Sequence, residues 1–382
     1  MSLLHAILDL LHDPLAFIAV LTVVVFIHEF GHFIVARKCG VKVQAFSIGF
    51  GREIVGYTDK YGTRWKLAWI PLGGYVKFVD DENSASVPSR EALENMTPDQ
   101  KTGAFQTKPL LHRAAIVAAG PIFNIVSAIL IYILTFWTLG TYGVDPIVGE
   151  VLPESAASKA GLQQGDRITA IEGTTMSRFS DLQRIVSQSP GRPLSFSIER
   201  QGKPTALTIT PKLSETVDPL GNKVQIGLIG IKPAATAAVH TRHGLAESIG
   251  LGFKETGFIA TQIVKSLPQL PQAIAKVFTG NKQSELGGPI AIAEMTGKAV
   301  KSGIGGLLGW IAVFSIMLGI MNLLPIPLLD GGHLMFYGLE ALRGKPLDER
   351  KQELSFRIGM AILATMMFAA ILGDVMRKFG MG

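Results

Sequence analysis

The stretch VVVFIHEFGHFIVA, residues 23–36, places two histidines and a glutamate in a segment with no other charged residue. An ionisable group at bilayer depth costs about 2.5 to 3.5 kcal/mol, so a set of three indicates a function. On a helix, His28 and His32 lie about 40° apart around the axis and about 6 Å apart along it, so both imidazoles can bind one zinc ion. Glu29, beside the first histidine, is placed to act as a general base and not as a ligand.

The composition is that of a membrane protein with a soluble part. The chain has 382 residues, of which 48% are hydrophobic and only 17% are charged. A membrane-spanning helix needs about 20 apolar residues; three stretches reach that length, and a fourth is shorter with charges at its ends. The first stretch is retained as a span because no small-residue cleavage site of a secretory signal follows it. The predicted spans cover residues about 14–36, 114–139, 303–329 and 356–376.

Basic residues cluster beside these segments and predict their orientation. The net charge is +6, and basic residues gather after the first predicted span, before the second, and between the third and fourth. By the positive-inside rule those ends face the cytoplasm, which places both termini and residues 145–302 on the other side. Because this charge flanks the membrane, it indicates contact with the lipid bilayer and no nucleic-acid partner.

The segments between the predicted spans form three further units. Residues 43–79 carry short alternating runs broken by glycines, which predict a membrane-associated β-loop, and the polar residues 80–112 predict a cytoplasmic loop. Residues 145–233 combine alternating runs with one helical stretch near 179–187, which is typical of a small α+β domain. Residues 234–302 are apolar at helical spacing but interrupted by charges and prolines, which predicts amphipathic helices on the membrane surface.

The predicted fold class is therefore a multi-pass α-helical membrane protein. It has about four transmembrane helices, a membrane-associated β-loop and one extracytoplasmic α+β domain. Residues 1–144 form its N-terminal membrane part, and residues 303–382 form its C-terminal membrane part.

The first helix supplies only two of the three protein ligands that a catalytic zinc ion usually has. The other polar break in a span is MNLLPIPLLDGGH, residues 321–333. Pro325 and Pro327 remove two backbone donors and would unwind the helix there, which is tolerated at membrane depth only in a protein-lined or wet cavity. Asp330 and His333 are the ionisable groups of this stretch, and from spacing alone either could be the third ligand.

Several motifs together carry a resemblance to a known family. The HExxH of the first span is followed far along the chain by NxxPxPxLDGG, and AASKAGLQQGDRITAIEG, residues 156–173, resembles the PDZ domain in the permuted form found in bacterial proteases. The runs FSIGFG, PLGGYVK and AAGPIFN extend the match over nearly the whole chain. The chain thus resembles the site-2 protease family of intramembrane zinc metalloproteases, in its bacterial regulator of sigma-E protease (RseP) group.

The resemblance implies roles for particular residues. The family pattern places its aspartate ligand at Asp330 and not at His333, which gives one zinc ion per chain held by His28, His32 and Asp330. It also implies a set of substrate-binding residues on the unwound stretch, the β-loop and the second span: Asn322, Pro325, Pro327, Gly49, Gly73, Gly74 and Asn124. Many members carry two tandem PDZ domains, whereas this chain has room for one, at residues 145–233.

The resemblance also implies an activity and a location. The expected reaction is hydrolysis of a peptide bond inside the bilayer, in a single-pass membrane protein already trimmed by another protease, such as an anti-sigma factor. The expected location is the bacterial inner membrane, with the PDZ-like domain in the periplasm, where it contacts peptide or excludes untrimmed chains, and the active site towards the cytoplasm. Two alternatives are a metal or proton transporter, which needs a continuous polar path, and a catalytically idle PDZ adaptor, which the presence of His28, Glu29 and Asp330 disfavours.

Overall fold

The computed structural model describes residues 3–81, 96–217, 223–234, 238–278 and 288–379. Within these ranges, four helices are long and apolar enough to cross a membrane. They are α1 (Leu3–Lys38, with the candidate span Leu11–Lys38), α4 (Leu110–Thr138), α10 (Ile304–Asn322) and α12 (Glu349–Phe379). The predicted cytoplasmic loop contains the short helix α3 (Pro98–Thr102), and its residues 82–95 lie outside the described part of the chain.

The third spanning helix ends earlier than its apolar sequence suggests. Helix α10 stops at Asn322, seven residues before the predicted limit, and the chain re-enters a helix at α11 (Asp330–Arg343). Between them, Pro325 and Pro327 have no N–H to donate to a preceding carbonyl, and Leu328 adopts a positive φ of 84°. The apolar character of residues 323–329 therefore belongs to a loop that delivers Asp330 to the first turn of α11.

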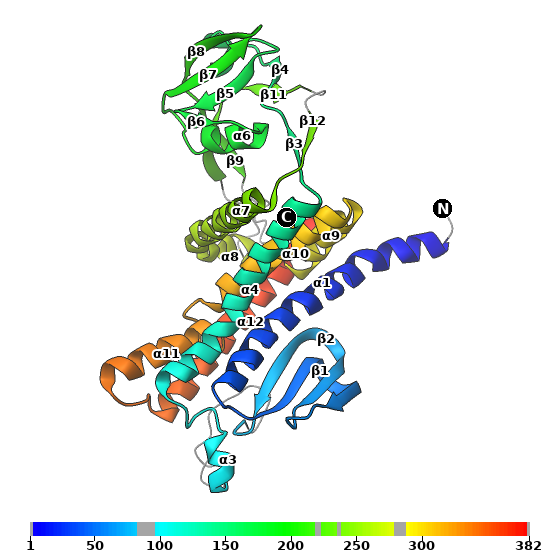
Figure 1. The fold of residues 1–382 in the computed structure, drawn as a ribbon, viewed down its shortest axis with the longest axis vertical. Helices are drawn as coiled ribbons and strands as arrows, with labels where there is room; N and C mark the ends of the chain where they lie inside the picture. The colour runs from blue at the N-terminus through cyan, green and yellow to red at the C-terminus, as the bar shows by residue number, and fades with distance from the viewer. Residues whose placement is uncertain (1–2, 82–95, 218–222, 235–237, 279–287, 380–382) are drawn as a thin grey trace.

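Helix α4 is the centre of the membrane part. It packs against α1, α7, α10 and α11, and Figure 1 shows α1 and α4 running side by side. Two glycines allow close approaches: a Cβ on Gly31 of α1 would lie 2.5 Å from the carbonyl oxygen of Ala119, and one on Gly319 of α10 would lie 3.0 Å from that of Pro121. The backbone of α4 is thus in direct contact with its neighbours on two sides.

The predicted β-loop is a long antiparallel hairpin, β1 (Val43–Thr58) and β2 (Arg64–Phe78). Residues 45–48 of β1 pair with both halves of β2, so the hairpin folds back on itself. Its inner side packs on the C-terminal half of α1 through a cluster that includes Phe33, Phe46, Trp65 and Val76. The packing fixes β2 against the helix that carries the histidines.

Asp59 fastens the turn of this hairpin to the end of α1. Its carboxylate accepts hydrogen bonds from the Arg37 guanidinium, the Trp65 indole and the backbone N–H of Tyr61. Burial would raise the pKa of Asp59, but these hydrogen bonds outweigh it and lower the pKa from 3.8 to about 2. The Arg37 guanidinium also lies over the ring of Tyr61, 4.4 Å from its centroid.

An α+β unit is inserted between α4 and α7, at the opposite end of the helices from the hairpin and α11 (Figure 1). Its base is the antiparallel pair β3 (Thr141–Val144) and β12 (Ala238–Thr241). Its main sheet has the order β6 (Thr174–Thr175), β5 (Arg167–Ile171), β7 (Leu194–Arg200) and β8 (Lys203–Ile209). The shorter elements are α5 (Ala156–Lys159), α6 (Phe179–Ser187) and the pairs β4 (Val148–Val151) with β11 (Ile231–Pro233) and β9 (Lys212–Val217) with β10 (Lys223–Leu228).

The segment predicted as surface helices is mostly helical but differs at its start. Strand β12 falls within residues 234–302, and its pairing with β3 had no local signal in the sequence. The helices that follow are α7 (Leu245–Ser266), the short 3₁₀ turn η1 (Leu267–Gln269), α8 (Leu270–Phe278) and α9 (Pro289–Lys301). Helix α7 packs directly on α4, where a Cβ on Gly252 would lie 2.6 Å from Ile133.

Candidate metal centre

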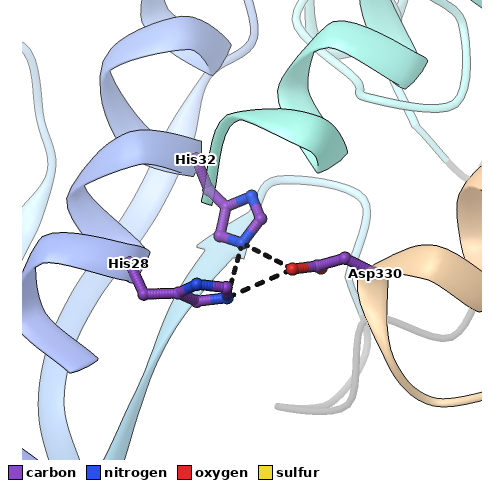
Figure 2. Close-up of side chains that lie close together, drawn as sticks. All are labelled: His28, His32 and Asp330. Carbon is purple, nitrogen blue, oxygen red and sulfur yellow. Dashed lines mark hydrogen bonds and ion pairs between the residues drawn. The ribbon is translucent and has the colours of Figure 1, made fainter. Parts of the chain in front are cut away.

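Three side chains from two distant parts of the chain meet beside α4. His28 and His32 lie one turn apart on α1, and Asp330 is the first residue of α11 (Figure 2). Oδ2 of Asp330 lies 3.1 Å from Nε2 of His28 and 3.5 Å from Nε2 of His32, and the two Nε2 atoms are 3.2 Å apart. Among the described residues, these three form the group whose ligand atoms could share one metal ion.

The spacing of these atoms fits a zinc ion. Zinc binds imidazole nitrogen and carboxylate oxygen at about 2.0 to 2.2 Å with tetrahedral geometry, which puts neighbouring ligand atoms about 3.3 to 3.5 Å apart. The three observed separations, 3.1, 3.2 and 3.5 Å, are within about 0.2 Å of one face of such a tetrahedron. Oδ2 of Asp330 is buried and accepts no hydrogen bond from the described residues, as expected for an oxygen that faces a metal.

Helix α4 fixes the orientation of the His32 ring. Nδ1 of His32 lies 2.8 Å from the carbonyl oxygen of Ile116. A carbonyl only accepts, so Nδ1 carries the proton, and Nε2 is the ring nitrogen left to offer its lone pair to a metal ion. Hydrogen bonds of this kind from the far ring nitrogen orient metal-ligating histidines.

Asn124 of α4 contacts the far ring nitrogen of His28. Its side chain is fully buried, with one amide atom 3.2 Å from Nδ1 of His28. If His28 binds a metal through Nε2, its Nδ1 carries the proton and needs an acceptor. In the present orientation the amide nitrogen faces His28, and Oδ1 has no partner. Rotating the amide by 180° places Oδ1 against Nδ1 of His28, where it accepts the proton of that nitrogen.

Gly120 forms the floor of the site. A Cβ at this position would lie 2.3 Å from Nε2 of His32 and 2.8 Å from Cε1 of His28. The backbone of α4 therefore touches both imidazoles, and a side chain on Gly120 would occupy the space of the ligand atoms. Gly120 was not predicted from the sequence, where its only signal is its place in the AAGPIFN run.

Glu29 lies beside the hairpin and outside the three-residue group. A Cβ on Gly74 of β2 would lie 3.2 Å from its Cγ, and the backbone N–H of Val76 hydrogen-bonds its carboxylate. The glutamate is thus one residue from His28 in sequence and directly against β2 in space.

The other predicted residues are not part of the three-residue group. The ring of His333 packs on Phe356, with centroids 5.5 Å apart, and His333 is not part of the three-residue group. Asn322 is the last residue of α10 and is partly exposed, followed by Pro325 and Pro327 in the loop that precedes Asp330. The remaining two, Gly49 and Gly73, lie on the hairpin strands with positive φ.

A multi-pass membrane protein with two histidines, a glutamate and a distant aspartate beside a spanning helix has the architecture of an intramembrane metal-dependent hydrolase. Comparison with known proteins identifies the family. The chain belongs to peptidase family M50, whose sequence model matches residues 16–366, and it is a zinc metalloprotease of this family.

Its relatives cover almost the whole chain. It is 44% identical to a protein named as a zinc metalloprotease in Rhizobium meliloti (strain 1021), over 95% of this chain and 96% of that one. A protein with the same kind of name in Agrobacterium fabrum is 42% identical, over 95% and 96%. The regulator of sigma-E protease RseP of Escherichia coli (strain K12) is 32% identical, over 97% of this chain and 100% of that one, in an alignment of 471 positions.

Proposed function

We propose that this intramembrane zinc metalloprotease holds one zinc ion between His28, His32 and Asp330 and cuts a peptide bond within the transmembrane segment of a single-pass membrane protein. The observation that carries the proposal is the position of Asp330, which lies far along the chain from the histidines yet within 3.5 Å of both. The three separations match a tetrahedral site. Without a metal ion, the buried carboxylate of Asp330 would have only the two imidazoles to balance its charge, and a buried charge is costly unless it is paired.

The roles of the surrounding groups follow from their contacts. When bound, zinc supplies a Lewis acid that polarises a carbonyl and lowers the pKa of bound water to about 7. Glu29 accepts the proton of the attacking water and passes it to the leaving amine. Ile116, Asn124 and Gly120 hold the two imidazoles with their Nε2 atoms directed at the centre.

The hairpin is suited to receive an unwound substrate. A transmembrane helix satisfies its own backbone groups, so it must open before a peptide bond can be attacked, and the released N–H and C=O groups then need partners. Strand β2 passes Glu29 at Gly74 and leaves Trp69, Ile70 and Leu72 at least half exposed. We assign the hairpin, with Gly49 and Gly73, the role of a strand that pairs with the substrate, and Asn322 and the proline loop the role of holding its other side.

The inserted unit, residues 145–233, is proposed to be a PDZ-like domain in the periplasm of a bacterium, with the metal centre towards the cytoplasmic side of the inner membrane. Its place at the end of the helices opposite α11 and the hairpin (Figure 1) and the basic residues near α11 support this orientation. The substrates that fit this arrangement have a short extracytoplasmic part left by a first cleavage, as an anti-sigma factor would. A domain above the helices would exclude untrimmed chains.

The test uses purified protein and a model single-pass substrate. Glu29→Gln should bind zinc as the wild type does and lose cleavage, because the amide cannot accept the proton, whereas His28→Ala should lose both. Cleavage by Glu29→Gln at the wild-type rate would refute the role of Glu29. Zinc bound by the wild type without any cleavage of a trimmed substrate would favour the adaptor alternative.

A further inference from the structure

The reach of Asp330 depends on how α11 is held, because the aspartate is the first residue of that helix. Helix α11 packs on α4, which also carries the groups that touch the two imidazoles. The position of α11 along α4 therefore sets the distance between Asp330 and the histidines.

An ion pair and a cation–π contact join α4 and α11 away from the metal centre. Arg113 of α4 forms a bidentate ion pair with Glu340 of α11, with Nη2 to Oε1 at 2.5 Å and Nη1 to Oε2 at 3.3 Å. The Arg113 guanidinium also lies 5.1 Å from the ring centroid of Tyr337. Both charged side chains are only 17% exposed, so solvent screens this pair less than it would an exposed pair.

The ion pair and the metal centre lie at two separate levels of the helix pair. On α4, Gly120 follows Arg113 by seven residues, a rise of about 10.5 Å. On α11, Glu340 follows Asp330 by ten residues, a rise of about 15 Å. The two helices thus run antiparallel with two points of contact, one at the ion pair and one at the metal centre.

We propose that Arg113 and Glu340 form a positioning clamp that sets the register of α11 on α4 and so brings Asp330 within reach of the histidines. A slip of α11 by one turn would move Asp330 by about 5.4 Å, more than its whole distance from either Nε2 atom. Neither clamp residue touches the centre, so both act through Asp330. The inference rests on the proposed ligand role of Asp330.

The clamp predicts a particular pattern of zinc affinity. Arg113→Gln and Glu340→Gln should each raise the zinc Kd about tenfold, measured by chelator competition on the purified protein, and should lower kcat while leaving KM near the wild-type value. The charge-reversed double variant Arg113→Glu with Glu340→Arg should restore the Kd to within about threefold of the wild type. Glu353→Gln is the matched control, because its ion pair with Arg357 on α12 is exposed.

Two results would overturn the clamp. One is a wild-type zinc Kd in both folded single variants, even if their melting temperatures fall, since the pair would then be only structural. The other is a double variant that binds zinc no better than the single variants. Asp330→Ala separates this failure from that of the proposed function. A wild-type zinc Kd in Asp330→Ala refutes the proposed ligand set. A loss of zinc binding in Asp330→Ala together with a wild-type zinc Kd in Glu340→Gln refutes the clamp alone.

Discussion

Gly120→Ala should weaken zinc binding without altering a ligand. The added Cβ would lie 2.3 Å from Nε2 of His32 and 2.6 Å from Cε1 of the same ring. Ordinary van der Waals contacts lie at about 3.5 to 4.0 Å, so either the ring or α4 must move by more than 1 Å. The backbone of α4 is held by its close contacts with α1 and α10, and the displacement therefore falls on the imidazole.

The magnitude follows from the cost of overpacking. An extra methyl group in a packed interior costs about 1 to 3 kcal/mol, which corresponds to a zinc Kd raised by a factor of about 5 to 150 if the strain falls on the ligand. Helix propensity acts in the opposite direction, because alanine favours a helix over glycine by about 1 kcal/mol. The apoprotein should accordingly fold normally and melt close to the wild-type temperature.

The assay is zinc titration with a competing chelator, together with thermal unfolding of the metal-free protein. Gly309→Ala is the matched control, because Gly309 also lies inside a spanning helix and a Cβ there meets nothing within 4 Å. It should bind zinc as the wild type does. Wild-type affinity in Gly120→Ala would show that the imidazoles do not bind a metal in the positions described here.

Three further predictions test the ligands, their support and the hairpin. Asp330→Ala should lower zinc occupancy, measured by elemental analysis, more than His333→Ala does, and the reverse order would move the ligand to His333. Asn124→Ala should raise the zinc Kd about 10- to 100-fold, whereas Asn124→Asp should bind nearly as the wild type because it still offers an oxygen to His28; equal losses in both would refute the acceptor role. Because the pKa of Asp59 is lowered to about 2, its ionised form contributes stability above about pH 4 that is lost as pH falls towards 2. Thermal unfolding between pH 6 and 2 should show this loss in the wild type and less of it in Asp59→Asn.

Local sequence patterns located the spanning helices well. Helix α4 occupies residues 110–138, where the apolar run predicted 114–139. An uninterrupted apolar segment in a bilayer forms a helix because its backbone groups must hydrogen-bond within the segment. The third span shows the limit of this reasoning. Its apolar residues continue to Leu329, but the helix ends at Asn322 because the two prolines of the following stretch cannot donate hydrogen bonds.

Contacts between distant segments were harder to predict. The β3 and β12 pair joins residues almost a hundred positions apart, and neither four-residue strand has a pattern of its own. The spacing of His28 and His32 predicted one metal-facing side of a helix, but it left Asp330 and His333 equal as the third ligand. The family resemblance favoured Asp330, and the structure places its carboxylate, and not the ring of His333, beside the two histidines.

The support of the site illustrates why part of its chemistry has no signature in the sequence. Ile116, Gly120 and Asn124 follow one another at intervals of four, so all three lie on one face of α4. They contact the imidazoles through a backbone carbonyl, through the absence of a side chain and through an amide. The first two contacts cannot be predicted from residue type, because every residue has a backbone carbonyl and glycine occurs in helices for several different reasons. It follows that, in the proposed metal centre, the face of α4 orients the ligands as much as the HExxH motif supplies them, and that a substitution on this face can weaken metal binding while every ligand remains.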